Sequence, residues 1–278
     1  DVTVPYTDDF PETYRAAYGA DFLENLPELF WDLPDNTPSR ARWRYHDHLA
    51  DRICTGFLQP IHDWCEKNGL ASTGHLVEEN TLEQQTFYGG SVMRGYRYFH
   101  IPGMDLLKDA LEFNTARQAV SVARQDGRPG VLSELFGCTE WNCSFAAFKA
   151  QGDWQAALGI TQRVPHLAWV SMGGEAKRDC PGTISYQQPW WRRFRQIEDH
   201  AARVNAILAH GTPIVRVAVI HPGESFWLAY GPEAESNEAC RTQEAAFANL
   251  TNWLAHGLID FDFISEALLP TQRGDGAG

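Results

Sequence analysis

The hydrophobic pattern alternates between two kinds of segment along most of the chain. Short apolar runs bounded by Gly, Pro or Asp are typical of buried strands, and longer stretches with apolar residues three or four positions apart are typical of helices. Strands are expected at residues 2–6, 70–77, 98–105, 131–136 and 167–172. Because a helical segment follows most of these runs, the pattern predicts a parallel sheet covered by helices.

The predicted helices lie between these runs. They are expected at residues 11–18, 22–30, 40–68, 106–124, 145–158, 188–208 and 238–256. The longest, 40–68, contains Pro60, which predicts a kink because proline lacks the N–H that continues a helical ladder. Gly69 follows it as a stop signal.

The strand count predicts part of a (β/α)8 barrel, the TIM-barrel form of the α/β class. Five strands are expected before residue 210, and a complete barrel has eight. If the last is strand eight, the chain carries strands four to eight and is a piece of a longer protein. After residue 210, the continuous apolar run 214–220 is typical of a buried parallel strand. We therefore expect a partial catalytic barrel at 1–210, the beginning of a second α/β domain at 211–271, and a disordered tail at 272–278.

Glu134 is the strongest catalytic candidate, because it ends a short apolar strand that follows a helix and the turn QDGRPG at 125–130. Catalytic residues of (β/α)8 barrels lie at the carboxyl ends of strands. A simple role for Glu134 in capping the next helix stays open. Other polar residues follow the other expected strands: Asp8, Asp9, His75, Glu78, Glu79, His100 and Asp105.

Composition narrows the class of ligand. The chain has 36 acidic and 23 basic residues and a net charge of −13, which argues against nucleic acid or an anionic membrane as a partner. No segment approaches the ~20 apolar residues of a membrane span. Aromatic residues make up 12% of the chain, with ten Trp. Because exposed rings can stack on sugars, Trp141, Trp169 and Tyr186 on late loops are candidate substrate-binding residues, with ordinary packing as the alternative.

Motifs of several other chemistries are missing from the sequence. It contains no GxGxxG, P-loop, HExxH or GxSxG motif, and its six cysteines include no CxxC pair. Without these motifs, the carboxylates at the predicted strand ends are the main indication of the protein's chemistry.

An ordered set of motifs resembles bacterial glycosyl hydrolases, similar to the barrels of the β-galactosidase clan and to the α-L-rhamnosidase family. The resemblance covers about residues 6–230. Its motifs include TDDFP at 7–11, GHLVEE at 74–79, HIPGMD at 100–105, SELFG at 133–137 and SYQQPWW at 185–191. The resemblance implies a (β/α)8 barrel followed by a flavodoxin-like or glutamine-amidotransferase-like domain.

The resemblance also implies roles for individual residues. Glu134 falls at the nucleophile position, and Asp9 falls where relatives carry the Glu that acts as acid/base. Asp is one methylene shorter than Glu, so Asp8 or Glu78 is an alternative proton donor, and the choice between Glu78 and Glu79 stays open. Asp8, His75, His100, Asp105, Trp141, Trp169 and Tyr186 are the expected substrate-binding residues.

These observations predict a glycoside hydrolase that removes a terminal sugar from oligo- or polysaccharides by a two-carboxylate mechanism. One alternative is a degenerate, non-catalytic carbohydrate-binding barrel, and another is a metal-dependent hydrolase using His75, Glu78, His100 and Asp105. No cofactor or metal is expected, although a divalent cation such as calcium is compatible with the residue types. Carbohydrate is the expected partner. The sequence does not distinguish bacterial cytoplasm from periplasm and leaves the oligomeric state open.

Overall fold

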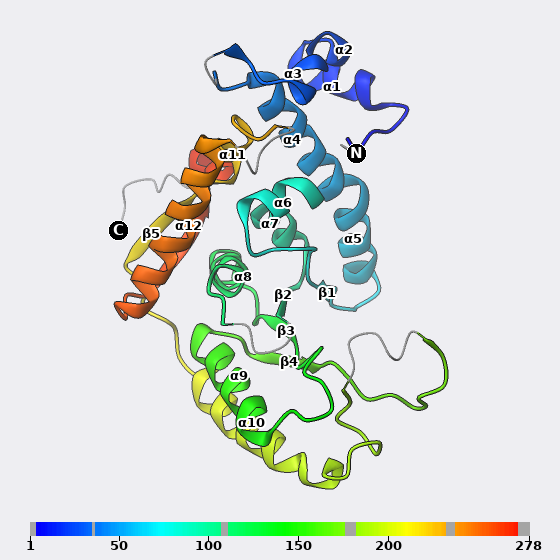
Figure 1. The fold of residues 1–278 in the computed structure, drawn as a ribbon, viewed down its shortest axis with the longest axis vertical. Coiled ribbons are helices and arrows are strands. Elements are labelled where there is room, and N and C mark those ends of the chain that lie inside the picture. Colours follow the sequence, from blue (N-terminus) through cyan, green and yellow to red (C-terminus); the bar gives the residue numbers. More distant parts are fainter. Residues whose placement is uncertain (1–3, 35–36, 107–110, 176–181, 232–236, 272–278) are drawn as a thin grey trace.

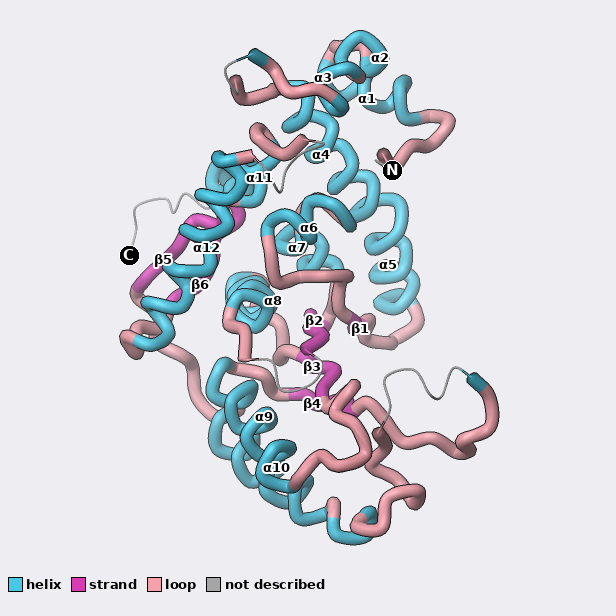
Figure 2. The backbone as a smooth tube through the Cα atoms, viewed as in Figure 1, coloured by secondary structure: helices cyan, strands magenta, loops and turns pink. Residues whose placement is uncertain are grey.

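The computed structural model describes residues 4–34, 37–106, 111–175, 182–231 and 237–271. A four-stranded sheet lies near the middle of the molecule between helices, and a separate two-stranded sheet lies at its left margin (Figures 1 and 2). Of the described helices, none is long and apolar enough to cross a membrane.

The central sheet has four parallel strands in the spatial order β1-β2-β3-β4, which is also their order along the chain. They are β1 (Thr73–Gly74), β2 (Ile101–Leu106), β3 (Leu132–Leu135) and β4 (Gln162–Pro165). Helices connect each strand to the next, as a parallel sheet requires. This curled parallel sheet fits part of a (β/α)8 barrel.

The connecting helices follow the expected alternation. They are α6 (Leu82–Tyr88), α7 (Val92–Gly95) and the 3₁₀ turn η3 (Tyr96–Tyr98) before β2, α8 (Asn114–Gln125) before β3, α9 (Phe145–Leu158) before β4, and η5 (Trp191–Arg193) with α10 (Arg195–Leu208) after it. Local signals explain α9: the Ser144 side chain accepts a hydrogen bond from Ala147 N–H, and Gly159 ends the helix with φ of +105°. The bounds of α9 match the prediction.

Two strand predictions are wrong. Residues 4–6 form no strand, and residues 1–3 lie outside the described part. The predicted strand 167–172 is irregular, and the strand beside β3 is β4, just before it. Its sequence Gln162-Arg163-Val164-Pro165 lacks an apolar run, so the apolar residues after it gave a misleading signal. Pro165 is acceptable at the end of a strand because little pairing follows it.

The long helix predicted at 40–68 is present with an interruption. It consists of α4 (Arg40–Ile53), a π-helical turn η2 (Cys54–Leu58) and α5 (Gln59–Lys67). Pro60 cannot donate to the carbonyl four residues earlier and its ring clashes with it, so the turn before it widens. The predicted helix 106–124 starts only at Asn114, because Leu106 still belongs to β2.

A helical cap lies at the amino-terminal end of the molecule (top of Figure 1). It comprises α1 (Phe10–Tyr18), α2 (Phe22–Asn25) and α3 (Pro27–Phe30), packed on α4. Its buried cluster contains Phe10, Tyr14, Phe22, Leu29, Tyr45 and Leu49. This core is separate from the larger one around the sheet.

The last part of the described chain forms a β–α–β unit with parallel β5 (Val217–His221) and β6 (Phe261–Ser265), together with α11 (Gly223–Trp227), α12 (Glu238–His256) and η6 (Glu266–Thr271). Phe261 and Phe263 of β6 join the core that contains Met104 of β2. Arg124 of α8 pairs with Asp262 at 2.9 Å. The expected domain division at residue 210 remains a prediction, and the expected disordered tail 272–278 lies outside the described residues.

Candidate active site at the carboxyl ends of the strands

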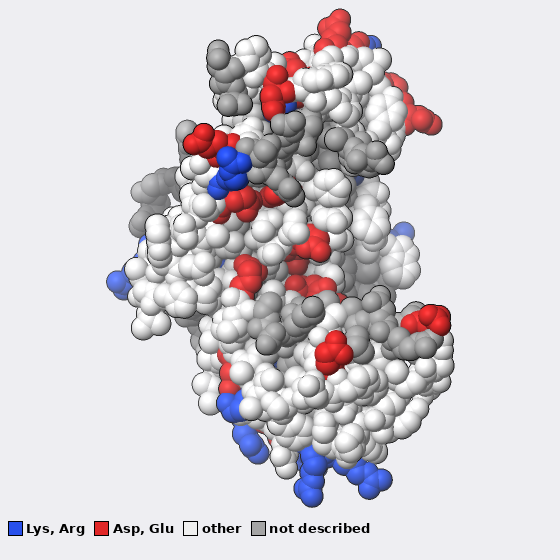
Figure 3. All heavy atoms as spheres, in the orientation of Figure 1, with Lys and Arg blue, Asp and Glu red and all other residues white. Residues whose placement is uncertain are grey.

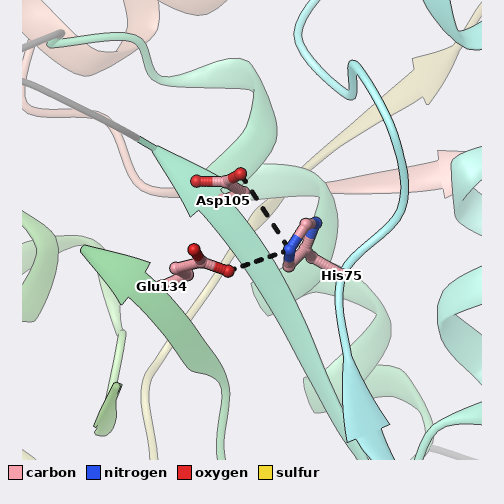
Figure 4. Close-up of side chains that lie close together, drawn as sticks. All are labelled: His75, Asp105 and Glu134. Atoms are coloured by element: carbon pink, nitrogen blue, oxygen red, sulfur yellow. Dashed lines mark hydrogen bonds and ion pairs between the residues drawn. The ribbon is translucent and has the colours of Figure 1, made fainter. Parts of the chain in front are cut away.

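Three polar side chains from consecutive strands meet at one edge of the sheet (Figure 4). His75 follows β1 directly, Asp105 lies near the end of β2, and Glu134 lies near the end of β3. Asp105 and Glu134 are register partners in the parallel β2–β3 ladder. Side chains at paired positions of neighbouring strands project from the same face, so the ladder itself brings the two carboxylates together.

His75 connects the two carboxylates. Its Nε2 lies 3.1 Å from Glu134 Oε2 and 3.9 Å from Asp105 Oδ2, and its Nδ1 lies 2.8 Å from Leu76 O. Burial lowers the pKa of His75, but the hydrogen bond to Leu76 and the charges of Glu79, Asp105 and Glu134 raise it, and the net shift is upward. A protonated ring donates to the Leu76 carbonyl and to the Glu134 carboxylate, which holds Glu134 in one orientation, and its charge lies close to Asp105.

Asp105 has the properties of a proton donor. Burial and the negative charge of Glu134 raise the pKa of its carboxyl group. Its Oδ1 is buried and has no hydrogen-bond partner among the described residues. A buried acceptor without a partner is costly, so this oxygen is available to a substrate atom, a water or a cation.

His166 completes the surroundings of Glu134, and sequence reasoning missed it. It follows β4 directly, its Nε2 lies 3.9 Å from Glu134 Oε1, and its Nδ1 is buried without a hydrogen-bond partner in the described part of the chain. The strand in this region was expected at residues 167–172, after His166. His166 was therefore not recognised as a strand-end residue. Its position directly after Pro165 could have identified it.

Glu79, and not Glu78, has a side chain that hydrogen-bonds to the Asp105 backbone, and which of the two has a role in the reaction stays a prediction. Glu79 is buried, and burial raises the pKa of its carboxyl group to about 7. Its Oε2 accepts a hydrogen bond from Asp105 N–H at 3.3 Å. Glu78 is exposed, with φ of +52°, and its charge is the last in order of the influences on the pKa of Asp105, after burial and the charges of Glu134, His75 and His166.

Asp8 and Asp9 are not brought to Glu134. Both lie at the start of α1 in the helical cap, whereas β3 lies near the middle of the molecule (Figure 1). The Asp9 carboxylate accepts from Thr7 Oγ1 at 2.7 Å and pairs with Arg52 at 2.8 Å. Residues 4–6, the described part of the expected strand before Asp9, form no strand, which removes the geometric basis for assigning Asp9 as the acid.

His100 is also remote from the group. Residues 101–106 form β2, so His100 and Asp105 lie toward opposite ends of one strand, ~16 Å apart at ~3.3 Å per residue. His100 Nδ1 accepts from Ser72 N–H at 3.0 Å, and its ring stacks on His62 with 4.1 Å between centroids. Both contacts are structural.

The three candidate aromatic residues gather on the loops that follow β3 and β4. The Trp141 and Trp169 rings lie 6.5 Å apart, and Tyr186 donates to Val170 O at 2.7 Å. Trp141 is 40% exposed and Tyr186 is 56% exposed, so both have free ring surface. The loops leave the sheet at the edge that carries Glu134, and the role of the rings in sugar stacking stays a prediction.

The group around Glu134 also has the chemistry of a cation site. One ligand atom from each of His75, Asp105 and Glu134 lies within 4.8 Å of the others. Nitrogen and carboxylate oxygen ligands suit divalent ions, and the unpartnered Asp105 Oδ1 fits such a site. Acidic side chains gather across the middle of the face shown in Figure 3, which favours a neutral or cationic ligand over an anionic one.

Comparisons with known proteins support the fold. No protein-family model matches the sequence, and no curated protein matches it. Among solved structures, the chain is similar to a rhamnosidase from Novosphingobium sp. PP1Y, with a TM-score of 0.65 and 18% identity over 94% of this chain. It is also similar to Gan42B, a GH42 β-galactosidase from G. stearothermophilus, and to a catalytic mutant of that enzyme, with a TM-score of 0.56 for each and 13% and 12% identity.

The chain spans 24% of the rhamnosidase and 43% of each Gan42B chain. At these identities the likeness concerns the fold. The resemblance to glycosyl hydrolases of these two kinds, expected from the motifs, is confirmed at that level.

Proposed function

We propose that this protein is a glycoside hydrolase that removes a terminal sugar, with Glu134 and Asp105 as its two carboxylates. The observation that carries the proposal is the pair itself: two half-buried carboxylates at matched positions of neighbouring strands, one with a raised pKa. The likeness in fold to a rhamnosidase and a β-galactosidase supports the reaction class.

In the proposed reaction, Glu134 is the nucleophile and attacks the anomeric carbon. Asp105 protonates the leaving oxygen, and the sugar is then held on Glu134 as an ester. Ionised Asp105 next takes a proton from water, and the resulting hydroxide releases the sugar. Asp105 replaces Asp9 in this role, since Asp9 lies in the helical cap paired with Arg52.

We propose that the reaction retains the anomeric configuration. Carboxyl groups of retaining enzymes lie roughly 5–5.5 Å apart, and inverting enzymes need roughly 6.5–9.5 Å to admit a water. One ligand oxygen of Asp105 lies within 4.8 Å of one of Glu134. This close approach favours the shorter spacing, in which Glu134 attacks the sugar directly.

The test uses the purified protein with aryl α-L-rhamnosides and aryl β-D-galactosides, the sugars that the names of the similar enzymes indicate. Proton NMR of the first-formed product determines its anomeric configuration. Hydrolysis with retention, lost in Glu134→Gln, supports the proposal. Binding of sugar without turnover by the unmodified protein would replace it with the non-catalytic carbohydrate-binding barrel, and inversion would exclude Glu134 as nucleophile.

A divalent-cation site at His75, Asp105 and Glu134 is the second candidate, favoured by the convergence of their ligand atoms. A bound ion would supply Lewis-acid chemistry, and the three side chains would hold it. Isothermal titration with Ca²⁺ and Zn²⁺, together with activity before and after chelation, separates the two candidates. Activity that chelation leaves unchanged supports the two-carboxylate reaction.

A further inference from the structure

Glu79 lies next to the carboxylate pair, and its side chain contacts the backbone of the loop after β1 and of β2. Its Oε1 accepts a hydrogen bond from Leu76 N–H at 2.8 Å, and its Oε2 accepts one from Asp105 N–H at 3.3 Å. Leu76 follows His75 in sequence and also accepts the His75 Nδ1 hydrogen bond. One carboxylate therefore connects the loop after β1 to the end of β2.

Further bonds fix Glu79 itself. Tyr96 donates its hydroxyl hydrogen to Oε1 at 2.8 Å. The Glu79 backbone carbonyl accepts from the side-chain amides of Gln85 and Gln118, each at 2.8 Å. Gln118 Oε1 in turn lies 2.7 Å from His221 Nε2 on β5. With both ends bonded and only 4% of its surface exposed, Glu79 has little freedom to move.

This arrangement exceeds what packing alone needs. Burying a carboxylate is costly unless its oxygens are hydrogen-bonded, and an apolar side chain of similar size would fill the space at lower cost. The bonds that offset this cost end on Leu76 and Asp105, next to or within the site. Moving a catalytic side chain ~1 Å from its productive geometry can lower a rate ~10²-fold. Hydrogen bonds that fix the backbone of His75 and Asp105 therefore have a catalytic consequence.

We infer that Glu79 is a positioning residue that clamps the Leu76 and Asp105 amides and so holds His75 and Asp105 against Glu134. The hydrogen bonds from Glu79 to these amides belong to the structure itself. Their effect on turnover rests on the proposed glycoside hydrolase function. Glu79 touches neither the proposed substrate atoms nor the Glu134 carboxylate, and it acts through the backbone of its neighbours.

The experiment compares Glu79→Gln and Glu79→Leu by NMR hydrogen exchange of the Leu76 amide. Leu removes both acceptors, so exchange at Leu76 should accelerate about tenfold or more, as expected for loss of a hydrogen bond to a charged group. Gln keeps the shape and one acceptor oxygen, so one of the two amides retains protection. Should the Leu variant fail to fold, the near-isosteric Gln variant provides the test through unequal protection of Leu76 and Asp105.

Glu224→Gln is the matched control. Glu224 is as buried as Glu79, at 4% exposed, but its partners are Arg94 and Ser265, away from the carboxylate pair. It should lower overall stability without selectively changing the exchange of Leu76 relative to other core amides. Equal Leu76 exchange in the Glu79 and Glu224 variants would overturn the clamp.

Kinetics provide the second readout. We expect kcat to fall about 10-fold in Glu79→Gln and about 100-fold in Glu79→Leu, with KM unchanged, because ground-state sugar contacts remain. The partial rescue by Gln distinguishes positioning from a general loss of stability, which Glu224→Gln also produces. If the unmodified protein hydrolyses no glycoside, the proposed function fails and the exchange data alone decide the clamp. If it does hydrolyse one and kcat of both Glu79 variants stays within twofold, the positioning role is excluded.

Discussion

The helical cap contains Asp9, which the sequence assigned to catalysis, and the strand-end site contains Asp105, which the sequence assigned to substrate binding. The surroundings of these two carboxylates differ in kind. In the cap, the Asp9 side chain is 54% exposed, and hydrogen bonds from Thr7 and Arg52 lower the pKa of its carboxyl group. At the strand ends, the Asp105 side chain is 30% exposed, and burial and Glu134 raise the pKa of its carboxyl group.

The difference separates a structural acid from a reactive one. Pairing with a guanidinium stabilises the charged form of Asp9 and makes it a poor proton donor near neutral pH. Asp105 and Glu134 are register partners, and among the described residues their ion-pair partners are histidines, with no Lys or Arg paired to either. Such groups in a cluster are candidates for function, whereas fully paired surface acids are candidates for stability.

The largest effect that tests this contrast is expected at Glu134. Glu134→Gln keeps the shape and removes the nucleophile, so kcat/KM should fall by about 10³-fold or more. Stopped assays with an aryl glycoside measure it. The exposed Glu140 on the following loop provides a matched control, because Glu140→Gln changes the same residue type outside the group. Comparable losses in both variants would mean that the loop, and not Glu134, determines activity.

Asp105→Asn should have the next largest effect. General acid–base groups contribute typically 10²–10⁴-fold, so kcat/KM for a sugar with a poor leaving group should fall about 10²-fold or more. The loss should shrink for aryl leaving groups of low pKa, which depart without a proton. A rate plot against leaving-group pKa measures the effect, and equal losses for all leaving groups would exclude Asp105 as the acid.

The pH profile should respond to His75 with a defined sign. Only protonated Asp105 can donate, so activity falls as pH rises through its raised pKa. The charge of His75 lowers the pKa of Asp105. His75→Asn removes that charge, so the alkaline limb should move to higher pH, while kcat/KM at the optimum falls about tenfold through loss of a charged hydrogen bond to Glu134. A limb that moves to lower pH would contradict this coupling.

Local patterns predicted part of this architecture. The helix 145–158 was predicted correctly because its cap residues are local, and Glu134 was placed at a strand end because β3 has an apolar, bounded sequence. The strand β4 was missed because Gln162 and Arg163 hide its pattern and only its pairing with β3 makes it a strand.

The sequence named His75, Asp105 and Glu134 as site residues, but the contacts among them could not be predicted, for a related reason. The Asp105–Glu134 pairing depends on the register of two strands, and the role of Glu79 depends on side-chain hydrogen bonds between distant elements. Neither leaves a periodic signal in the sequence. Asp9 was chosen because of its motif, and its actual partner, Arg52, lies on α4, 43 residues away.

The smallest effect is expected at Asp9, where it concerns folding and not turnover. Asp9→Asn should leave kcat/KM within about twofold of the unmodified protein, because α1 is remote from β3. Its lowered pKa means that the ionised group stabilises the folded state above its unfolded pKa of ~3.9, and that this contribution disappears as pH falls through the lowered value. Thermal unfolding at pH 7 and pH 3 should therefore show a small loss of stability in the variant at pH 7 and a smaller one at pH 3. A large loss of turnover with unchanged unfolding would return Asp9 to the active site and reverse the contrast between the two regions.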